Sequence, residues 1–401
     1  YSISVKAVPS MGDVAQGRIS VADLTNIDVS DLLGRQCVEP SKALLSKCIL
    51  GANVLVTGAG GSIGSELCRQ ILKQNPARIV LFELTEFALY QIERELQQHA
   101  HSDIEIIAIL GNVQDKFHLL RVMQSYQINT VYHAAAYKHV PLVEHNVFAG
   151  LRNNVFGTLN CAEAAVEAAV DHFVLVSTDK AVRPTNVMGA TKRLAELVLQ
   201  AITLRGDHST QFSMVRFGNV LGSSGSVIPL FKQQIRSGGP VTVTHPEVTR
   251  YFMTIPEAAS LVIQAGAMGG NGEVFVLDMG EPVRIVDLAK EMISLSGCSL
   301  RTEENPEGDI AIEFSGLRPG EKLYEELLIG DNVQGTDHAM IMRAQEDALS
   351  WPEMEQCLQR FEKSITALDY KGLMAAIEET AQGYKPETEI FDHLYVAQRT
   401  S

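Results

Sequence analysis

A glycine-rich segment between an apolar run and an amphipathic run constrains the fold of this chain more than any other feature. Residues 54–64 read VLVTGAGGSIG. Glycine adopts backbone angles that other residues avoid and lets a ligand approach the main chain closely. Between a strand and the helix that follows it, such a loop is typical of a site that holds the pyrophosphate of a dinucleotide. The candidate cofactor residues of this segment are Thr57, Gly58, Gly60, Gly61, Ser62, Ile63 and Gly64.

Short apolar runs alternate with amphipathic runs over the next 150 or so residues. Continuous Val/Ile/Leu runs are typical of strands buried on both faces, and strands that alternate with helices predict a parallel sheet. The sequence therefore predicts an α/β protein with a Rossmann-type, doubly wound parallel sheet. The expected strands are Asn53–Thr57, Arg78–Phe82, Ile104–Leu110, Thr130–His133, Phe173–Ser177 and Phe212–Arg216. The expected helices are Ile63–Gln74, Glu86–Gln98, Asp115–Tyr126, Phe148–Ala169 and Asn186–Leu204.

Four segments are expected along the chain. Residues 1–50 form a lead-in with one short helix at Asp31–Arg35, and residues 51–217 form an NAD-binding Rossmann domain. After Arg216 the alternation gives way to Gly/Ser/Pro-rich stretches. Residues 218–345 are therefore interpreted mainly as a smaller C-terminal substrate-binding lobe, with some elements that return to the sheet. Residues 346–401 are expected to be a helical extension.

Composition excludes several classes of protein. The 401 residues are 46% hydrophobic and 20% charged, which is typical of a folded globular chain. The formal net charge of −15 opposes binding to a phosphate backbone, so no nucleic-acid partner is expected. The six cysteines are scattered, which predicts neither a disulfide framework nor a metal site. No apolar run approaches the roughly 18–20 residues of a membrane-spanning helix, so this chain is not expected to cross a bilayer.

An acid at the end of the second expected strand favours NAD as the cofactor. Glu83 follows Gly64 by about 20 residues, where a carboxylate hydrogen-bonds the adenosine ribose. A carboxylate would repel the extra phosphate of NADP, which is therefore the less favoured cofactor. The small or apolar loops after the third and fourth strands suit the adenine edge and the nicotinamide ribose, although each loop alone is also explained by packing. Their candidate residues are Asn112, Val113, Ala134, Ala135 and Ala136.

Several motifs together resemble a known family. TGxxGxxG at residues 57–64, HAAA at 133–136 and STDK at 177–180, with Lys192, resemble the extended short-chain dehydrogenase/reductase family. Residues 177–193 within it resemble UDP-N-acetylglucosamine 4,6-dehydratases of bacterial polysaccharide and glycan biosynthesis, and RFGNVLG, TRYFM and LRPGEK extend the match. The resemblance is strongest to membrane-tethered members. It implies a cytoplasmic catalytic domain whose parent protein is anchored in the bacterial inner membrane by preceding helices.

The resemblance implies a redox-neutral reaction on a UDP-sugar. The sugar is oxidised at carbon 4, water is eliminated across carbons 5 and 6, and the hydride returns to carbon 6. NAD is then tightly bound and regenerated in each turnover. We assign Lys180 as the base at carbon 5, Asp179 as the acid at carbon 6, and Thr178 as a hydrogen-bonding partner at carbon 4. Burial would raise the pKa of the acid and lower that of the lysine, as the chemistry favours, although their mutual attraction opposes both shifts.

One position departs from the family pattern. The family's catalytic tyrosine lies four residues before Lys192, and Met188 occupies that place. This change from tyrosine to methionine resembles the membrane-tethered subgroup. A thioether cannot take the hydroxyl proton at carbon 4. The candidates for the missing base are Asp179, directly or through water and Thr178, and, less favoured, Tyr137. Lys192 remains able to hold the nicotinamide ribose.

Charge and resemblance together indicate the substrate residues. Arg250 and Arg318 are candidate partners of the UDP pyrophosphate, assisted by Asn219. The segments of Val227 and Thr242 resemble a uracil cradle, and Glu321 resembles a ribose-binding acid. The full set of candidate substrate residues is Lys138, Asn219, Val227, Thr242, Arg250, Arg318 and Glu321.

Two other interpretations were weighed against the dehydratase. A UDP-sugar 4-epimerase predicts an intact tyrosine and no Asp-Lys pair, and the sequence has neither property. A non-catalytic NAD-binding protein would tolerate the loss of Asp179, Lys180 and Lys192, yet all three are present. The helices expected at Phe148–Ala169 and around Lys192 resemble the pair that forms four-helix dimer interfaces in the family, which predicts a homodimer or a higher homo-oligomer.

Overall fold

The computed structural model describes residues 38–100, 103–326, 333–386 and 392–400. The helix expected at Asp31–Arg35 lies outside these residues. The described chain divides into two compact units. The large unit comprises Val38–Gly218, Ile255–Met279 and Arg318–Ser401, and the small unit comprises Asn219–Thr254 and Gly280–Leu317. The four-segment division of the chain stays a prediction.

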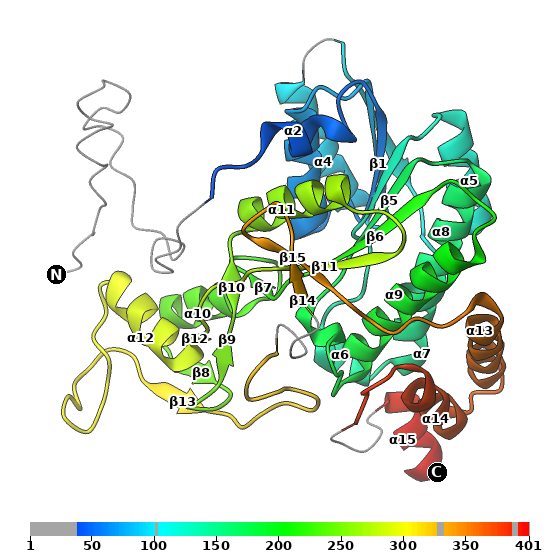
Figure 1. Ribbon diagram of the computed structural model, residues 1–401. Helices are drawn as coiled ribbons and strands as arrows, with labels where there is room; N and C mark the ends of the chain where they lie inside the picture. Colours follow the sequence, from blue (N-terminus) through cyan, green and yellow to red (C-terminus); the bar gives the residue numbers. More distant parts are fainter. Residues whose placement is uncertain (1–37, 101–102, 327–332, 387–391, 401) are drawn as a thin grey trace, which may run out of the picture. The chain divides into compact units, whose positions relative to one another are not determined.

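A nine-stranded sheet forms the centre of the large unit (Figure 1). The strand order is β14-β15-β11-β6-β5-β4-β1-β2-β3. Strands β1 to β6 and β11 are parallel, whereas β15 and β14 join the edge in antiparallel pairs. The sheet strands are β1 (Asn53–Thr57), β2 (Arg78–Glu83), β3 (Glu105–Leu110), β4 (Thr130–His133), β5 (His172–Val176), β6 (Gln211–Arg216), β11 (Glu273–Leu277), β14 (Val333–Gly335) and β15 (Ile341–Ala344).

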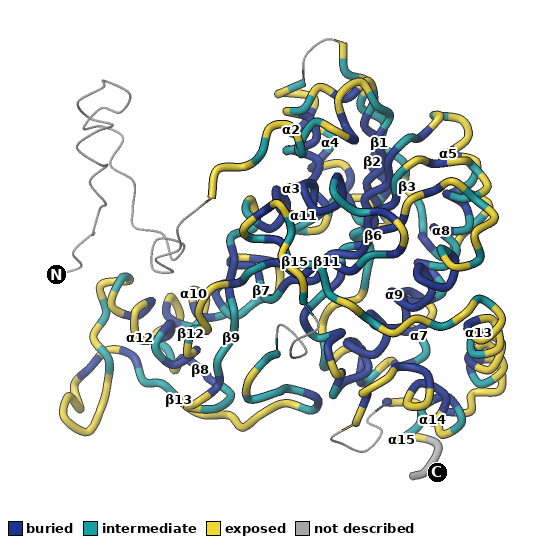
Figure 2. Tube along the Cα trace, viewed as in Figure 1, coloured by how far each residue is buried: buried dark blue, intermediate teal, exposed yellow. Residues whose placement is uncertain are grey.

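The order 3-2-1-4-5-6 of the first six strands is the doubly wound Rossmann arrangement, so the predicted fold class is confirmed. Each of the six predicted strands has both boundaries within one residue of its observed position. The central strands are buried on both faces, as Figure 2 shows by their dark blue colour. Burial on both faces explains why these strands read as continuous apolar runs in the sequence.

Helices cover both faces of this sheet. On one face lie α2 (Lys42–Lys47), α3 (Ser62–Leu72), α4 (Glu86–His99) and α11 (Ile255–Met268). On the other lie α5 (Lys116–Ser125), α8 (Gly157–Glu167) and α9 (Val187–Arg205). The remaining helices of the large unit are α6 (Val140–Glu144), α7 (Val147–Leu151), η3 (Arg152–Phe156), η4 (Asp179–Ala181), α13 (Trp351–Thr366), α14 (Tyr370–Thr380) and α15 (His393–Thr400).

The helix expected at Phe148–Ala169 is not continuous. It divides into α7, a π-helical turn η3, and α8. Within η3 the side chain of Asn154 bonds the main chain of Tyr137, with Oδ1 accepting from its N–H at 2.8 Å and Nδ2 donating to its carbonyl at 2.9 Å. Its Nδ2 also donates to the Thr191 hydroxyl on α9 at 2.9 Å. The extra residue of a π turn thus directs Asn154 at two neighbouring segments, which apolar periodicity does not reveal.

The C-terminal helices pack on the large unit. α13 lies against α9 and α14, and Met354, Leu358 and Phe361 of α13 belong to the same core as the apolar residues of α9. Every residue of α9 from Val187 to Ile202 is buried. α9, one of the two helices that resemble a dimer-forming pair, is therefore buried within this chain, and the oligomeric state stays a prediction. None of the described helices is long and apolar enough to cross a membrane.

The small unit contains three two-stranded pairs and two helices. β7 (Asn219–Val220) pairs with β10 (Phe252–Met253), and β8 (Val241–Val243) pairs with β13 (Ile312–Phe314), both in parallel. β9 (Thr249–Arg250) pairs with β12 (Val283–Arg284) in antiparallel register. The helices α10 (Val227–Arg236) and α12 (Ile285–Leu295) pack together through buried apolar faces.

Candidate active site

The glycine loop lies at the carboxyl end of β1 and leads into α3. Gly58 has φ +68°, and a Cβ there would lie 2.8 Å from the main chain of Ala135. A Cβ on Gly64 would lie 2.0 Å from the carbonyl oxygen of Gly58. α3 begins at Ser62 after Gly61, which has no side chain to cap the helix. This bare loop at a helix N-terminus fits the pyrophosphate of a dinucleotide.

Glu83 ends β2 beside this loop, as expected. Its Oε2 accepts a hydrogen bond from the Gly60 N–H at 3.0 Å. Its Oε1 accepts from the N–H groups of Leu84 at 3.0 Å and Thr85 at 2.9 Å. Three main-chain donors therefore fix the carboxylate at the carboxyl edge of the sheet, where an adenosine ribose would reach it.

The predicted loops after β3 and β4 lie at the same edge, because β3, β2, β1 and β4 are parallel neighbours. Asn112 forms a tight turn in which its Oδ1 accepts from the Gln114 N–H at 2.9 Å. Val113 is buried, and the Ala134 N–H donates to the Thr57 carbonyl at 3.1 Å. The residues predicted to surround the cofactor are thus placed around one edge of the sheet.

Thr57 differs from its neighbours because its side chain serves the core. Its hydroxyl is 2.7 Å from Nδ1 of His133, and Nε2 of that ring is 3.1 Å from the Thr158 hydroxyl. Burial lowers the pKa of His133 to about 3, so the imidazole is neutral. Thr57 therefore contributes main chain rather than its hydroxyl to the loop.

Asp179 and Lys180 form a buried pair directly after β5, as the sequence predicts. Thr178 is the N-cap of the short helix η4, and its hydroxyl donates to Oδ1 of Asp179 at 2.8 Å. Lys180 Nζ lies 3.1 Å from the same oxygen. The Asp179 side chain is 0% exposed and that of Lys180 is 21% exposed. The pair is therefore a largely desolvated acid–base unit, not a surface ion pair.

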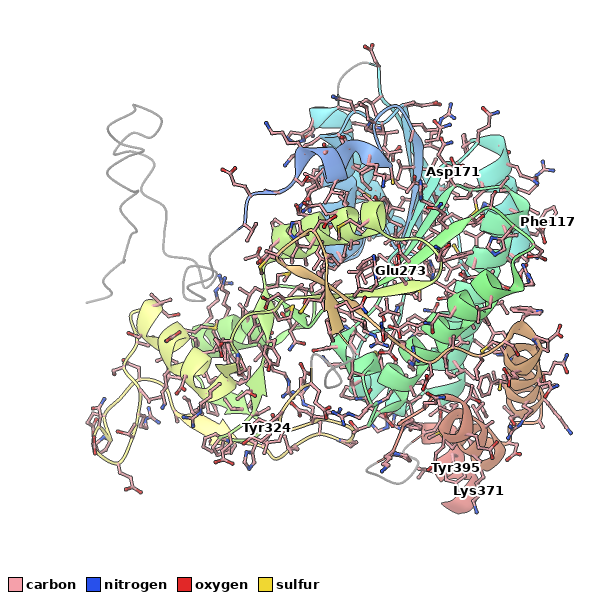
Figure 3. The ribbon with its side chains drawn as sticks, viewed as in Figure 1. Phe117, Asp171, Glu273, Tyr324, Lys371 and Tyr395 are labelled. Atoms are coloured by element: carbon pink, nitrogen blue, oxygen red, sulfur yellow. The ribbon has the colours of Figure 1, made fainter. Side chains whose placement is uncertain are left out.

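A second carboxylate, which the sequence analysis missed, contacts this lysine. Oε1 of Glu325 lies 2.8 Å from Lys180 Nζ, and the Glu325 side chain is 6% exposed. The preceding residue, Tyr324, is 54% exposed and is labelled in Figure 3. The signal in the sequence was the run YEE, which continues the LRPGEK motif by only a few residues.

The two carboxylates determine the protonation of the site. Burial raises the pKa of Asp179, and the nearby Glu325 carboxylate raises it further. Burial alone would lower the pKa of Lys180, but the charges of Asp179 and Glu325 outweigh it and raise that pKa. Burial and the mutual attraction of the pair oppose each other, as the sequence indicates: burial prevails for the pKa of Asp179, and the two carboxylate charges prevail for that of Lys180.

Met188 and Lys192 lie on the first turns of α9. Met188 is 3% exposed and packs in the apolar core. Lys192 Nζ donates to the carbonyl of Val176 at the end of β5, at 2.7 Å. Burial lowers the pKa of Lys192 to about 8. α9 thus places the lysine beside the turn that carries Asp179, with the methionine facing apolar groups.

A buried ionic network, also missed by the sequence analysis, lies behind this turn. Glu196 on α9 accepts from the Ser177 hydroxyl at 2.6 Å and from Nη2 of Arg216 at 2.6 Å. Arg193 Nη1 also donates to it at 3.2 Å. Glu196 therefore joins α9 to the carboxyl ends of β5 and β6, which fixes the position of residues 178–180.

The candidate substrate residues are divided between the two units. Lys138, Arg318 and Glu321 belong to the large unit, where the Arg318 N–H donates to Oε2 of Glu321 at 3.2 Å. Asn219, Val227, Thr242 and Arg250 belong to the small unit.

Within the small unit, the Asn219 N–H donates to the Tyr251 carbonyl at 3.1 Å, which places Asn219 beside the segment of Arg250. Val227 begins α10, and the Thr242 hydroxyl accepts from Gln234 of that helix at 2.7 Å. The substrate roles of all seven residues stay predictions.

Named relatives share most of this chain. The Staphylococcus aureus capsular polysaccharide biosynthesis protein CapD is 57% identical over 321 residues, which cover 80% of this chain and 52% of CapD. This chain thus spans about half the length of that relative. A UDP-N-acetylglucosamine 4,6-dehydratase (inverting) of Campylobacter jejuni is 29% identical, covering 80% of this chain and 89% of the relative. A UDP-glucose 4-epimerase of Rickettsia prowazekii is 33% identical, covering 71% and 80%.

Solved structures agree with the fold. Pen from Bacillus thuringiensis has a TM-score of 0.65 and 31% identity, covering 78% of this chain and 98% of Pen. The dTDP-glucose 4,6-dehydratase DesIV from Streptomyces venezuelae, solved as a double mutant with NAD and DAU bound, has a TM-score of 0.58. At 21% identity over 69% of this chain and 88% of DesIV, that likeness supports the fold alone.

The family model described as "Polysaccharide biosynthesis protein" matches residues 54–346. This range contains the glycine loop, Glu83, the Thr178–Lys180 turn, α9 and all seven candidate substrate residues. The chain therefore belongs to the polysaccharide biosynthesis protein family of extended short-chain dehydrogenases/reductases.

Proposed function

We propose that this chain carries the catalytic site of an NAD-dependent UDP-sugar 4,6-dehydratase. The proposed substrate is UDP-N-acetylglucosamine and the product UDP-2-acetamido-2,6-dideoxy-4-hexulose. One observation carries the proposal: a buried carboxyl group and a lysine, 3.1 Å apart, lie at the carboxyl end of β5. An elimination across two adjacent carbons needs an acid and a base side by side, whereas a simple hydride transfer does not.

The proposed cofactor is NAD, held by the glycine loop and Glu83. When bound there, NAD supplies the hydride acceptor for carbon 4 and the hydride donor for carbon 6. The open N-terminus of α3 favours the pyrophosphate charge, and the Glu83 carboxylate disfavours a ribose phosphate. Lys192 is proposed to donate to the nicotinamide ribose.

The residues after β5 have distinct roles in the proposed reaction. The ketone at carbon 4 makes the proton at carbon 5 acidic, and Lys180 removes that proton once it has lost its own. Asp179 gives its proton to the departing hydroxyl group at carbon 6, which leaves as water. Thr178 hydrogen-bonds the sugar at carbon 4, and Asp179, directly or through Thr178 and water, is the proposed base in place of the absent tyrosine.

The substrate roles follow from charge and from the family resemblance. We propose that Arg250 and Arg318 bind the UDP pyrophosphate with Asn219, because a guanidinium group donates two parallel hydrogen bonds to phosphate. Resemblance to membrane-tethered members supports a cytoplasmic catalytic domain in an anchored parent protein.

A UDP-sugar 4-epimerase is the second candidate, favoured by the Rickettsia relative. An epimerase oxidises and reduces carbon 4 and performs no chemistry at carbons 5 and 6. The buried Asp179 and Lys180 would have no task in that reaction, and Met188 removes the tyrosine on which it depends.

One assay tests the proposal. The purified protein is incubated with UDP-N-acetylglucosamine and no added reductant, and the product is followed by its absorbance in alkali and by the proton signal of a new methyl group. We expect a 4-keto-6-deoxy product with no net change in reduced nicotinamide. Stoichiometric consumption of NADPH would indicate a net reduction, and the carbon-4 epimer as sole product would indicate an epimerase; either result contradicts the proposal.

A further inference from the structure

Glu325 and Asp179 approach the same ammonium group from different parts of the chain. Lys180 Nζ lies 2.8 Å from Oε1 of Glu325 and 3.1 Å from Oδ1 of Asp179. The side chains of the two acids are 6% and 0% exposed. Two buried carboxyl groups and one lysine therefore form a single cluster, whereas the mechanism above uses only one of the carboxyl groups.

The loop that carries Glu325 is fixed to the start of α9. Asn186, the N-cap of α9, donates from Nδ2 to the Gly320 carbonyl at 3.0 Å. Lys322 donates from Nζ to the Arg183 carbonyl at 3.0 Å. The approach of Glu325 to Lys180 is therefore held by two hydrogen bonds on the same loop, in addition to the ion pair itself.

The cluster brings a second negative charge close to Asp179. Oδ2 of Asp179 is buried and accepts no hydrogen bond from any donor in the described part of the chain. After burial, the charge of Glu325 is the second cause of the raised pKa of Asp179. Two carboxyl groups that contact the same lysine do not both ionise readily.

We propose that Glu325 is a positioning residue of the active site, which holds the Lys180 amino group together with Asp179 and places a second negative charge beside the pair. This inference rests on the proposed dehydratase function. In the elimination the C5–H bond breaks and an N–H bond forms on Lys180. The C6–O bond breaks, the Asp179 proton forms the water molecule, and the C5–C6 double bond forms. Lys180 ends the step charged and Asp179 ends it without its proton.

Glu325 acts on that end state in two ways. Its negative charge stabilises the Lys180 ammonium group, and its proximity to the Asp179 carboxylate favours the return of a proton to Asp179. The first effect favours removal of the C5 proton, and Lys180 becomes neutral again when it returns that proton to C5 as the hydride reaches C6. Neither effect requires Glu325 to touch the sugar, so it acts only through Asp179 and Lys180.

Other charged groups lie on the elements packed around this cluster. In the described chain, the charges that shift the pKa values of Asp179 and Lys180 come from the three members of the cluster themselves. The nearby groups on α6, on α9 and on the two adjoining loops are Glu144, Arg183, Lys192, Lys322 and Glu326.

The test is the pH profile of turnover in Glu325→Gln. The amide keeps the shape of the side chain and removes its charge, so the pKa values of both Asp179 and Lys180 fall. Both limbs of the profile are therefore expected to move to lower pH by about one unit or more. Glu326→Gln is the matched control, because the adjacent Glu326 is 39% exposed and pairs with Arg183 instead. Glu325→Asp restores the charge and is expected to move the profile back toward wild type.

A second measurement needs no turnover. The infrared band of the protonated Asp179 carboxyl group, identified by its loss in Asp179→Asn, is titrated in wild type and in Glu325→Gln. The midpoint is expected to fall in the variant. The infrared titration does not depend on the reaction and tests only the role of Glu325. The dehydratase proposal is tested separately, by the product assay described above. Unchanged pH limbs and an unchanged infrared midpoint in Glu325→Gln, whatever its melting temperature or rate, would overturn the inference.

Discussion

The glycine loop after β1 and the Thr178–Lys180 turn after β5 lie at the same edge of the sheet, but different groups form them. The loop is mainly glycine main chain without side chains, and the charge beside it, Glu83, comes from the neighbouring strand. Charged side chains form the turn, and one of them, Glu325, comes from a distant segment. The loop should therefore be sensitive to added volume, and the turn to the loss of single charges.

The largest effect is expected at the turn. Lys180→Ala removes the proposed base and should reduce turnover by about 10²–10⁴-fold, because general acid–base catalysis contributes that much. Bound NAD, measured after denaturation, should stay at the wild-type level since the loop is unchanged. The control is Lys371→Ala on α14, an exposed lysine that is labelled in Figure 3. Turnover close to wild type would show that Lys180 is not the base, and that the turn is no more sensitive to the loss of a charge than the loop is.

The loop should respond to a single methyl group. Gly64→Ala places a Cβ 2.0 Å from the Gly58 carbonyl oxygen, so the main chain must move. We expect less bound NAD and a loss of about 1–3 kcal/mol in the free energy of unfolding, as for other overpacked sites. Gly335→Ala is the control, because a Cβ there meets nothing within 4 Å. Equal NAD content in both variants would show that the loop accommodates the added methyl group without loss of NAD binding.

The third prediction concerns the carboxylate of Glu83 beside the loop and its effect on NAD binding. Glu83→Ala removes the acceptor of three main-chain N–H groups and the carboxylate proposed to bind the ribose. Binding of NAD should weaken by about 1.5–3 kcal/mol, with relaxed discrimination against NADP, since hydrogen bonds to a charged group contribute that much. Titration of apoprotein with both cofactors measures this, with Glu93→Ala at a half-buried position on α4 as the control. An unchanged preference would place the ribose acid elsewhere.

The smallest effect on turnover is expected at Met188. The side chain is 3% exposed in the core, so Met188→Ala should lower the free energy of unfolding by about 2–5 kcal/mol. Turnover at a temperature where the variant is folded should stay within a few-fold of wild type, because a thioether moves no proton. Met354→Ala on α13, buried in the same core, shows what packing loss alone does. A much larger loss of turnover than in that control would show that Met188 does more than pack.

Sequence patterns predict the fold and the loop because both depend on neighbouring residues. A run such as Val54–Val56 is apolar because it is buried, and the observed boundaries of its strand β1 match the pattern. The glycine spacing lies within one strand–helix junction, so the sequence predicts the loop, whereas the approach of Gly64 to Gly58 comes from the structure.

The rest of the site depends on contacts between distant segments. Apolar periodicity does not show the π turn at Asn154, because that turn is stabilised by bonds to Tyr137 and Thr191. The adjacent Asp179 and Lys180 predict an ion pair, but they do not reveal that Glu325 also raises the pKa of the lysine. The sequence predicts that some later elements return to the sheet, but its pattern does not identify them as the parallel β11 and the antiparallel β15.

The packing of α13 on α9 has a consequence for biosynthesis. α9 carries Met188 and Lys192, and its apolar surface is closed by residues that the ribosome adds much later, such as Met354 and Phe361. Domains fold during translation as their residues emerge, at about 5–20 residues per second. The strands up to β6 can assemble before α13 exists, and the nascent chain then presents an uncovered helix for several seconds. Maturation of the active-site helix is thus coupled to completion of the C-terminal helices, and an interrupted chain would expose the surface that chaperones bind.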